Sequence, residues 1–454
     1  MFLLMDAELM TLSIVVSIIV FSLLILGLSA GLIAARTRLL PQGDVEISIN
    51  KGERKLKIKP GDTLLTALAK DNVFLPSACG GGGTCAMCKC QVDTGGGDVL
   101  PTEMNHLTRR EASANWRLAC QVKVREDMNV RVPEEIFGIK KWDCEVVSNY
   151  NVATYIKEFV VKLPEGEELD FDAGGYIQVD VPPTEVDYST IDITAHPRMG
   201  KASDVFKAEW DQFQMWSLKM KNPEPIFRAY SMANHPAEGN IIMLNIRIAT
   251  PPLEWKFTKQ DDGTVKRVFG KWKPINPGIC SSYVFNRKPS DKVTISGPYG
   301  EFHIKPSDKE MVYIGGGAGM APLRSHLFHL FHTLKTTHRK ISYWYGGRAP
   351  KELFYLDDFR QIEQEFPNFK FYVCIDRMPP EGNWNEMKTT DDEGDGFIGF
   401  VMPVLKEQYL DAHPEPEEVE YYYCGPPAMA NSIQVALDDL GVPPENIAFD
   451  DFGE

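Results

Sequence analysis

The sequence has few cysteines and no excess of basic residues. Its 454 residues include nine cysteines, 48 lysines and arginines, and 63 aspartates and glutamates, so the formal net charge is -15. Nine cysteines are too few for a disulfide framework in a chain of this length. The acidic balance excludes a protein that binds nucleic acid through a long basic face. The remaining composition, 43% hydrophobic and 24% charged, is typical of folded domains and excludes a disordered or polytopic membrane protein.

Residues 9–35 contain no charged side chain. A helix of this length, at ~1.5 Å per residue, reaches about 40 Å, which exceeds the ~30 Å hydrocarbon core of a bilayer. Arg36 and Arg38 follow directly, and the basic end of a span stays in the cytoplasm. A signal peptide is the alternative, but the run is longer than a signal core and acidic residues precede it. We therefore expect an N-terminal transmembrane anchor over residues 1–40, with the rest of the chain cytoplasmic.

The length and the hydrophobic pattern predict three folded domains after the anchor, because single cores stop growing near ~250–300 residues. Residues 41–135 predict a small mixed domain. Short strand-like runs dominate residues 136–300, as in an antiparallel β-barrel. Strands alternate with helices over residues 301–454, which indicates an α/β domain with a parallel sheet. Two stretches without clear periodicity, 183–225 and 251–277, are expected to be surface loops.

Local patterns in the first of these domains predict where individual helices and strands begin and end. Alternating residues on both sides of a charged turn predict a β-hairpin over residues 45–60. A short helix over residues 63–71 should follow, with Asp62 or Thr63 as its N-cap. Strand-like runs lie at residues 122–133, near the end of the domain.

Four of the nine cysteines form one constellation. Cys79, Cys85 and Cys88 lie in a glycine-rich loop with gaps of five and two residues, and Cys120 follows well downstream. Plant-type [2Fe–2S] centres use three clustered cysteines and a distant fourth, with a first gap one residue shorter. A zinc site is the alternative, but zinc sites usually pair two C-x2-C knuckles and this sequence lacks a second one. The spacing favours an iron–sulfur cluster, with Cys90 as a buried spare thiol.

Two motifs in the predicted barrel have chemistry suited to a flavin. In residues 228–231, the arginine can pair with a pyrophosphate, the tyrosine can stack on an isoalloxazine ring, and the serine can bond near its reactive N5. Residues 278–282 precede a helix-like stretch and offer N–H groups and hydroxyls to a phosphate. Each motif alone also fits an ordinary strand or turn, but their order favours a flavin site. The candidate flavin ligands are Arg228, Tyr230, Ser231, Gly278, Ser281 and Ser282.

A glycine-rich turn over residues 314–322 follows a predicted strand and precedes a helix. In this context a turn can hold a pyrophosphate. The turn lacks the G-x-G-x-x-G spacing of the ordinary dinucleotide fingerprint, so that assignment is excluded. The candidate ligands in the turn are Gly315, Gly316, Gly317 and Gly319.

These motifs resemble two known families. Residues 42–135, with the cysteine loop and the later Leu-Ala-Cys-Gln, resemble a plant-type ferredoxin domain, whose fold is a β-grasp. Residues 140–454 resemble the ferredoxin–NADP reductase superfamily in the glycine turn, in Tyr-Gly-Gly-Arg at 345–348 and in Cys-Gly-Pro-Pro at 424–427. This resemblance implies an FAD-binding barrel followed by an NADH-binding α/β domain. It adds three nucleotide contacts, namely Cys424, Gly425 and Pro426.

The same resemblance bears on the chain end and on the type of nicotinamide. In the reductase superfamily a terminal aromatic covers the flavin face, which implies Phe452 as a gate; a frayed tail is the alternative. NADPH needs basic groups for its 2′-phosphate, and only Arg348 and Lys351 lie near the expected place. Glu352 beside them favours NADH.

The order of anchor, ferredoxin, flavin barrel and nicotinamide domain resembles the electron-input subunits of sodium-translocating NADH:quinone oxidoreductases. That family resemblance implies NADH oxidation by hydride transfer to FAD, then one-electron transfer through the [2Fe–2S] cluster to partner subunits and ubiquinone, coupled to Na+ translocation. It places the chain in a bacterial inner membrane. Two alternatives remain: a reductase component of a multicomponent oxygenase, and a zinc-binding scaffold with an inactive reductase domain. The uncharged residues 9–35 argue against the first, which is normally soluble.

Overall fold

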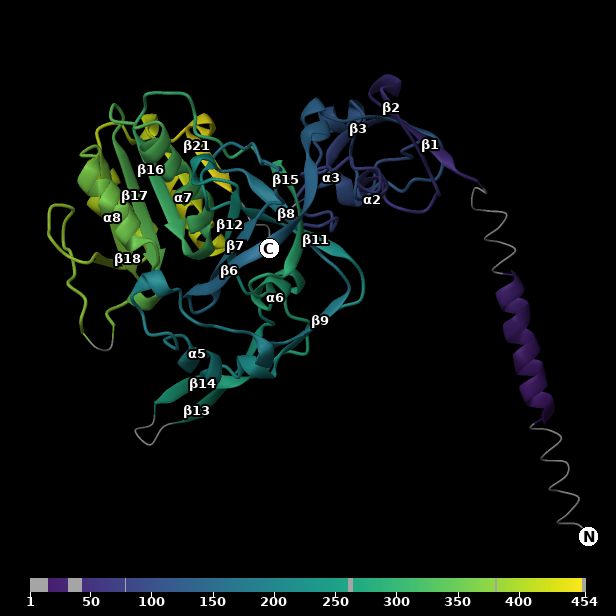
Figure 1. Cartoon of the computed structure of the whole chain (residues 1–454), viewed down its shortest axis with the longest axis horizontal. Coiled ribbons are helices and arrows are strands. Elements are labelled where there is room, and N and C mark those ends of the chain that lie inside the picture. Colours follow the sequence, from purple (N-terminus) through teal and green to yellow (C-terminus); the bar gives the residue numbers. More distant parts are fainter. Residues whose placement is uncertain (1–14, 32–42, 78, 260–263, 380–381, 451–454) are drawn as a thin grey trace, which may run out of the picture. The chain divides into compact units, whose positions relative to one another are not determined.

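The computed structural model contains two compact units (Figure 1). The first unit comprises Met1–Leu75 and Gly81–Phe137, and the second comprises Pro76–Gly80 and Gly138–Glu454. The structure describes residues 15–31, 43–77, 79–259, 264–379 and 382–450.

A helix covers residues 15–31, within the predicted anchor. Its side chains are exposed throughout, including Phe21 at 67% and Leu26 at 64%. Among the described residues, no helix combines the length and the apolar character needed to cross a membrane. The predicted anchor over residues 1–40 extends outside the described residues at both ends and stays a prediction.

The first unit contains a five-stranded mixed sheet with the order β2-β1-β5-β3-β4. The predicted hairpin is confirmed, since Val45 pairs with Ile58 in an antiparallel register. Thr63 is the N-cap of the short helix, because its hydroxyl accepts a hydrogen bond from the Thr66 N–H at 3.2 Å. The strand-like pattern at residues 122–127 is wrong as a strand and forms a single bridge. The elements are β1 (Val45–Ile49), β2 (Arg54–Ile58), α2 (Leu64–Ala69), β3 (Lys89–Thr94), α3 (Pro101–Met104), α4 (Arg109–Ser113), β4 (Trp116–Leu118) and β5 (Met128–Arg131).

The second unit begins with the predicted antiparallel barrel. Its six-stranded sheet has the order β11-β8-β15-β6-β7-β12. The two outer strands meet, because Met232 bridges Leu244 and the Ala233 N–H donates to the Met243 carbonyl at 2.7 Å. This contact closes the barrel. The strands are β6 (Lys140–Ala153), β7 (Ile156–Lys162), β8 (Tyr176–Val181), β11 (Ile226–Ser231), β12 (Ile241–Arg247) and β15 (Lys292–Tyr299).

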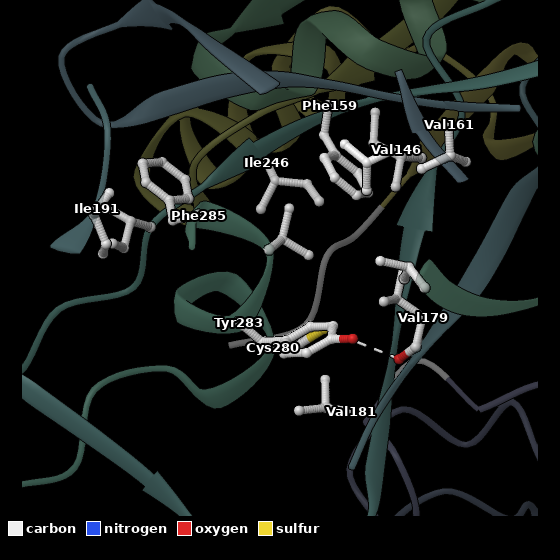
Figure 2. Close-up of a cluster of buried hydrophobic side chains, with 14 of the residues drawn as sticks. Val146, Phe159, Val161, Val179, Val181, Ile191, Ile246, Cys280, Tyr283 and Phe285 are labelled. Carbon is white, nitrogen blue, oxygen red and sulfur yellow. Dashed lines mark hydrogen bonds between the residues drawn. The ribbon is translucent and has the colours of Figure 1, made fainter. Parts of the chain in front are cut away.

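Alternating side chains of these strands build the barrel interior, as Figure 2 shows for Phe159 and Val161. Helix α6 (Ile279–Phe285) packs against the same core. The Cys280 thiol on this helix is 3.9 Å from the Val179 carbonyl of β8. The barrel core therefore holds the start of α6, which carries the second predicted flavin motif, against β8.

The expectation of surface loops is wrong for residues 183–225. This segment forms β9 (Thr184–Asp187), α5 (Lys207–Gln212) and β10 (Lys219–Asn222), and its large apolar side chains join the barrel core. They are spaced irregularly, so no periodic pattern reveals them. The fully buried ones are Tyr188, Phe206, Trp210, Met215 and Met220.

Residues 251–277 do contain an exposed element. β13 (Leu253–Lys259) and β14 (Val265–Trp272) pair in an antiparallel hairpin. Phe257 is 70% exposed and Val265 is 65% exposed. The expected surface position of this stretch is therefore confirmed, but the expected loop is wrong, because most of it pairs as a hairpin.

The α/β part is confirmed as a wholly parallel sheet with the order β19-β18-β17-β16-β20-β21. Tyr313 and neighbouring side chains on one face pack with α7 and α8, and Ile314 and its neighbours on the other face pack with α9 and α10. Figure 1 shows β16, β17 and β18 of this sheet with α7 and α8 beside them. The elements are β16 (Met311–Gly316), α7 (Met320–Phe328), β17 (Ile341–Gly347), α8 (Leu356–Glu365), β18 (Phe369–Ile375), β19 (Phe397–Ile398), α9 (Val401–Gln408), β20 (Glu420–Cys424), α10 (Pro427–Asp439) and β21 (Ile447–Asp450).

A buried ion pair ties β4 of the first unit to α3. Arg117 Nη2 lies 2.7 Å from Glu103 Oε2, and the two side chains are 5% and 0% exposed. The carboxylate also accepts hydrogen bonds from the backbone N–H groups of Leu100 and Leu118, both at 2.9 Å. Burial alone would raise the pKa of Glu103, but the hydrogen bonds from Arg117 and these N–H groups hold it below its usual value. The pair therefore orders the strand that leads to Cys120.

Replacement of Glu103 by Gln should destabilise the first unit by about 3–5 kcal/mol at neutral pH, because it leaves a buried guanidinium without its counter-charge. Since the folded pKa is lowered, the carboxylate's contribution is present above its usual pKa of ~4.3 and is lost as the pH falls through the folded value. Urea unfolding of the full chain, followed by the visible absorption of the reconstituted cysteine centre, measures this loss.

The control is Asp93→Asn, which removes the exposed pair with Arg131 and should cost at most ~1 kcal/mol. Equal losses in the two variants would contradict the assigned role of Glu103.

Candidate functional site

Three of the four predicted cluster ligands gather in the first unit. The Cys88 thiol is hydrogen-bonded to Cys120, and Cys85 interacts with it electrostatically. The hydrogen bond to Cys120, then burial, and the neighbouring thiols raise the pKa of Cys88. Gln121 Nε2 donates to the Cys120 sulfur at 3.6 Å. This part of the first unit therefore combines interacting thiols with the Gln121 side-chain amide as a hydrogen-bond donor.

Glycines make the cysteine loop possible. Gly81 and Gly83 have φ values of +90° and +79°, which L side chains rarely adopt. A Cβ on Gly83 would also lie 2.6 Å from Gln121 Nε2. Cys90 is fully buried on β3, and burial raises its pKa to about 12, which suits a spare thiol.

Cys79 belongs to Pro76–Gly80, the segment that groups with the second unit. Within the described ranges, no group of three or more His, Cys, Asp or Glu side chains is arranged to hold a metal ion. The donor chemistry suits a [2Fe–2S] cluster, since the thiols lose their protons when they bind iron and an amide can donate to a ligating sulfur. The set of Cys79, Cys85, Cys88 and Cys120 stays a prediction.

The second unit contains one large cavity of about 1810 Å³. This volume exceeds the ~300–1,000 Å³ typical of small-molecule sites, so it has room for extended dinucleotides. The cavity joins the barrel to the carboxyl ends of the parallel strands. The predicted residues that line it are Cys79, Arg228, Tyr230, Ser231, Gly278, Ser281, Gly316, Gly317, Gly319, Gly425 and Pro426.

Strand β11 presents the first flavin motif to this cavity. Arg228 and Tyr230 are two residues apart and pair with Val179 and Ile177 of β8. Among the described contacts, the Arg228 guanidinium gives one donor to the Phe227 carbonyl at 2.8 Å, which leaves most of its five donors for an anion. Burial raises the pKa of Tyr230 well above its usual value, so the ring stays neutral and suits stacking.

The start of α6 forms the second flavin motif. A Cβ on Gly278 would lie 2.5 Å from the Ala249 Cβ, so close approach requires glycine there. Ser281 lines the cavity, and its hydroxyl accepts a hydrogen bond from the Ala249 N–H at 3.1 Å. Ser282 does not line it. Its hydroxyl donates to the Gly278 carbonyl at 2.6 Å and bonds Tyr188, so the structure gives Ser282 a packing role.

The glycine turn after β16 packs directly against the end of β20. A Cβ on Gly319 would overlap the Cys424 carbonyl oxygen. From β16 the chain runs out to β19 on one side and returns to β20 on the other, so the two turns flank the switch point of the sheet. Ligands of parallel sheets bind at such points.

Gly315 and Cys424 lie in the strands behind the two turns, outside the cavity lining. A Cβ on Gly315 would lie 2.6 Å from the Tyr343 hydroxyl, so its glycine is required by packing. Cys424 is fully buried. The structure therefore brings the other turn residues to the cavity but not these two.

Two cavity features were not predicted. The Ser231 hydroxyl donates to the carboxylate of Asp450 at the end of β21, and Glu209, from the segment 183–225, lines the cavity. A lone acidic residue in an aperiodic segment carries no sequence signal. Phe452 lies outside the described residues, so the gate stays a prediction.

Comparison with solved structures identifies the fold. The chain resembles the Amycolatopsis cytochrome P450 reductase GcoB, with a TM-score of 0.55 at 23% identity, covering 90% of this chain and 98% of that one. It also resembles the ferredoxin reductase in carbazole 1,9a-dioxygenase, with a TM-score of 0.52 at 20% identity and the same coverage. Two domain families match parts of the chain: the 2Fe-2S iron-sulfur cluster binding domain at residues 47–125 and the oxidoreductase NAD-binding domain at residues 313–435.

Closer relatives cover nearly the whole chain. A protein of Idiomarina loihiensis is 50% identical over 434 residues, with 95% of this chain and 97% of that protein covered. A protein of Pseudomonas paraeruginosa is 48% identical with the same coverage, and one of Klebsiella pneumoniae is 47% identical over 97% of this chain and 99% of that protein. All three are named as the F subunit of a Na(+)-translocating NADH-quinone reductase. The chain therefore belongs to the family of Na(+)-translocating NADH-quinone reductase F subunits.

Proposed function

We propose that this chain oxidises NADH and delivers the electrons to other subunits of a membrane complex that reduces ubiquinone and moves Na+. When bound, FAD accepts two electrons as a hydride and releases them singly, and a [2Fe–2S] cluster carries one. The names of the relatives support the complex and its quinone. The chain's own residues bind and orient these groups.

The flavin motif and the nicotinamide turns line the same cavity. Hydride transfer needs the two rings in contact. Arg228 and Tyr230 line one part of the cavity, and Gly316–Gly319 line another. One continuous cavity can therefore hold a flavin and a nicotinamide together.

Each group of residues has a defined task. Arg228 pairs with the flavin pyrophosphate and Tyr230 stacks on the ring system. Ser231 would lie at the flavin site, and because its hydroxyl donates its proton to Asp450, it would act toward the flavin only as an acceptor. The turns that end in Gly319 and Pro426 would hold the NADH pyrophosphate, and Phe452, which lies outside the described residues, is the proposed gate of the flavin face.

The four cysteines Cys79, Cys85, Cys88 and Cys120 hold the cluster, and residues 1–40 anchor the chain. The uncharged run over residues 9–35 supports a single pass through a bacterial inner membrane with the bulk of the chain in the cytoplasm. Sodium movement and quinone reduction then belong to partner subunits, because one apolar span offers no ion pathway.

Replacement of Cys88 by Ser should abolish the [2Fe–2S] absorption and the electron paramagnetic resonance signal of the reduced cluster. Bleaching of the flavin by NADH should persist, because the flavin motif lies in the second unit. The matched control is Cys90→Ser, which should retain the cluster. Loss of the cluster from the Cys90 variant alone would contradict the proposed ligand set.

Replacement of Gly319 by Ala should lower kcat/KM for NADH by at least about tenfold, because the new Cβ displaces the turn from the Cys424 carbonyl. FAD content should not change. Gly138→Ala is the control, since its Cβ would meet open space. Steady-state kinetics with an artificial acceptor test this, and an unchanged kcat/KM in the Gly319 variant would rule out the turn as the NADH site.

A further inference from the structure

The turn after β17 lies at the cavity wall and holds charges of both signs. Arg348, Lys351 and Glu352 follow the strand and line the cavity. In doubly wound sheets the residues after the second strand meet the adenosine ribose, where an acid bonds the 2′-hydroxyl or a base accepts a 2′-phosphate. The sequence of this turn is compatible with either ribose, the one with a 2′-hydroxyl or the one with a 2′-phosphate. The contacts of its charged side chains therefore indicate which ribose fits.

Glu352 is engaged by the barrel. Its two carboxylate oxygens accept hydrogen bonds from Thr154, one from the backbone N–H at 3.0 Å and one from the hydroxyl. Thr154 lies between β6 and β7 and is fully buried. Glu352 therefore fastens the turn to the barrel, and each of its two carboxylate oxygens already accepts one hydrogen bond.

The positive charge of Lys351 is balanced by Glu209, a residue distant in the sequence. Its ammonium group forms an ion pair with Glu209 on α5, with side chains 34% and 25% exposed. Lys201 reinforces the contact, since its ammonium donates to the carbonyls of Lys351 and Leu353 at 2.7 and 2.9 Å. The segment 183–225 thus holds the turn and cancels one of its two positive charges.

The Glu209 carboxylate can accept more hydrogen bonds than it receives from the described residues. Its Oε1 pairs with Lys351, while its Oε2 is buried and meets no hydrogen-bond donor in the described part of the chain. A carboxylate accepts about four hydrogen bonds, and an unsatisfied buried oxygen is costly. Since Glu209 lines the cavity, a hydroxyl donor from a bound ligand would complete its bonding.

We propose that Glu209 selects NADH over NADPH at the adenosine ribose. Its carboxylate accepts the 2′-hydroxyl, withholds Lys351 from a 2′-phosphate and repels that group, which carries a charge of about −1.5 to −2. This inference rests on the proposed function, because it takes Gly316–Gly319 as the pyrophosphate site. The selecting acid then comes from an inserted segment and not from the turn itself.

Calorimetry of the full chain with FAD, using ADP-ribose and 2′-phospho-ADP-ribose, tests this without hydride transfer. Glu209→Gln should weaken ADP-ribose about tenfold and strengthen the 2′-phosphorylated fragment about tenfold, as expected for hydrogen bonds and ion pairs to charged groups. The double variant Glu209→Gln/Lys351→Gln should lose the gain for the phosphorylated fragment. The ratio of kcat/KM for NADPH and NADH should shift in the same direction.

Asp211→Asn is the matched control, because Asp211 lies on the same helix and pairs with Lys207 away from the cavity lining. Its two affinities should equal those of the wild type. If Glu209→Gln fails to fold, Lys351→Gln still tests the proposal, since it should weaken the phosphorylated fragment further and spare ADP-ribose.

Equal changes in both affinities, or none, for Glu209→Gln would overturn the assignment while leaving the NADH site intact. Failure of the wild type to bind ADP-ribose at all would instead contradict the proposed function, and the inference with it.

Discussion

The close approach of the turn after β16 to the end of β20 is the constraint on which the site depends. Gly319 lies so near the Cys424 carbonyl that no side chain fits between them. That contact fixes both turns at the switch point of the parallel sheet, and helices packed on its two faces hold the strands in register. The barrel shares the resulting cavity. The position of the site is thus a consequence of sheet topology, and the side chains that line the cavity determine what it can bind.

The segment 183–225 contacts both the barrel core and the turn after β17. Trp210 and its neighbours sit in the barrel core, while Lys201 and Glu209 reach the turn after β17. One inserted segment therefore packs into the barrel core and shapes the part of the cavity beside the turn after β17. The solved reductases share the fold at 20–23% identity, which identifies architecture alone. The family relatives, at 47–50% identity over 95–97% of the chain, favour the respiratory assignment over an oxygenase reductase.

Local patterns predicted much of the fold. The hairpin from Val45, the cap at Thr63, the short strands of the barrel and the alternation of strands with helices in the α/β part follow from local patterns and capping alone. The failures concern contacts distant in sequence. No local signal separates Ser281, which lines the cavity, from Ser282, which bonds Tyr188. The anchoring of the aperiodic segment 183–225 and the roles of Glu209 and Asp450 depend on tertiary contacts, which single-sequence patterns do not encode.

Electrons from NADH should enter at the flavin of the second unit and reach the cluster proposed on Cys79, Cys85, Cys88 and Cys120 only afterwards. Anaerobic stopped-flow mixing of the full, cofactor-loaded chain with NADH tests this order directly, because flavin and cluster absorb differently. Flavin absorption should fall first, and cluster absorption should fall afterwards at a separate rate. Reduction of the cluster before the flavin, or a fully loaded chain in which NADH reduces neither, would contradict it.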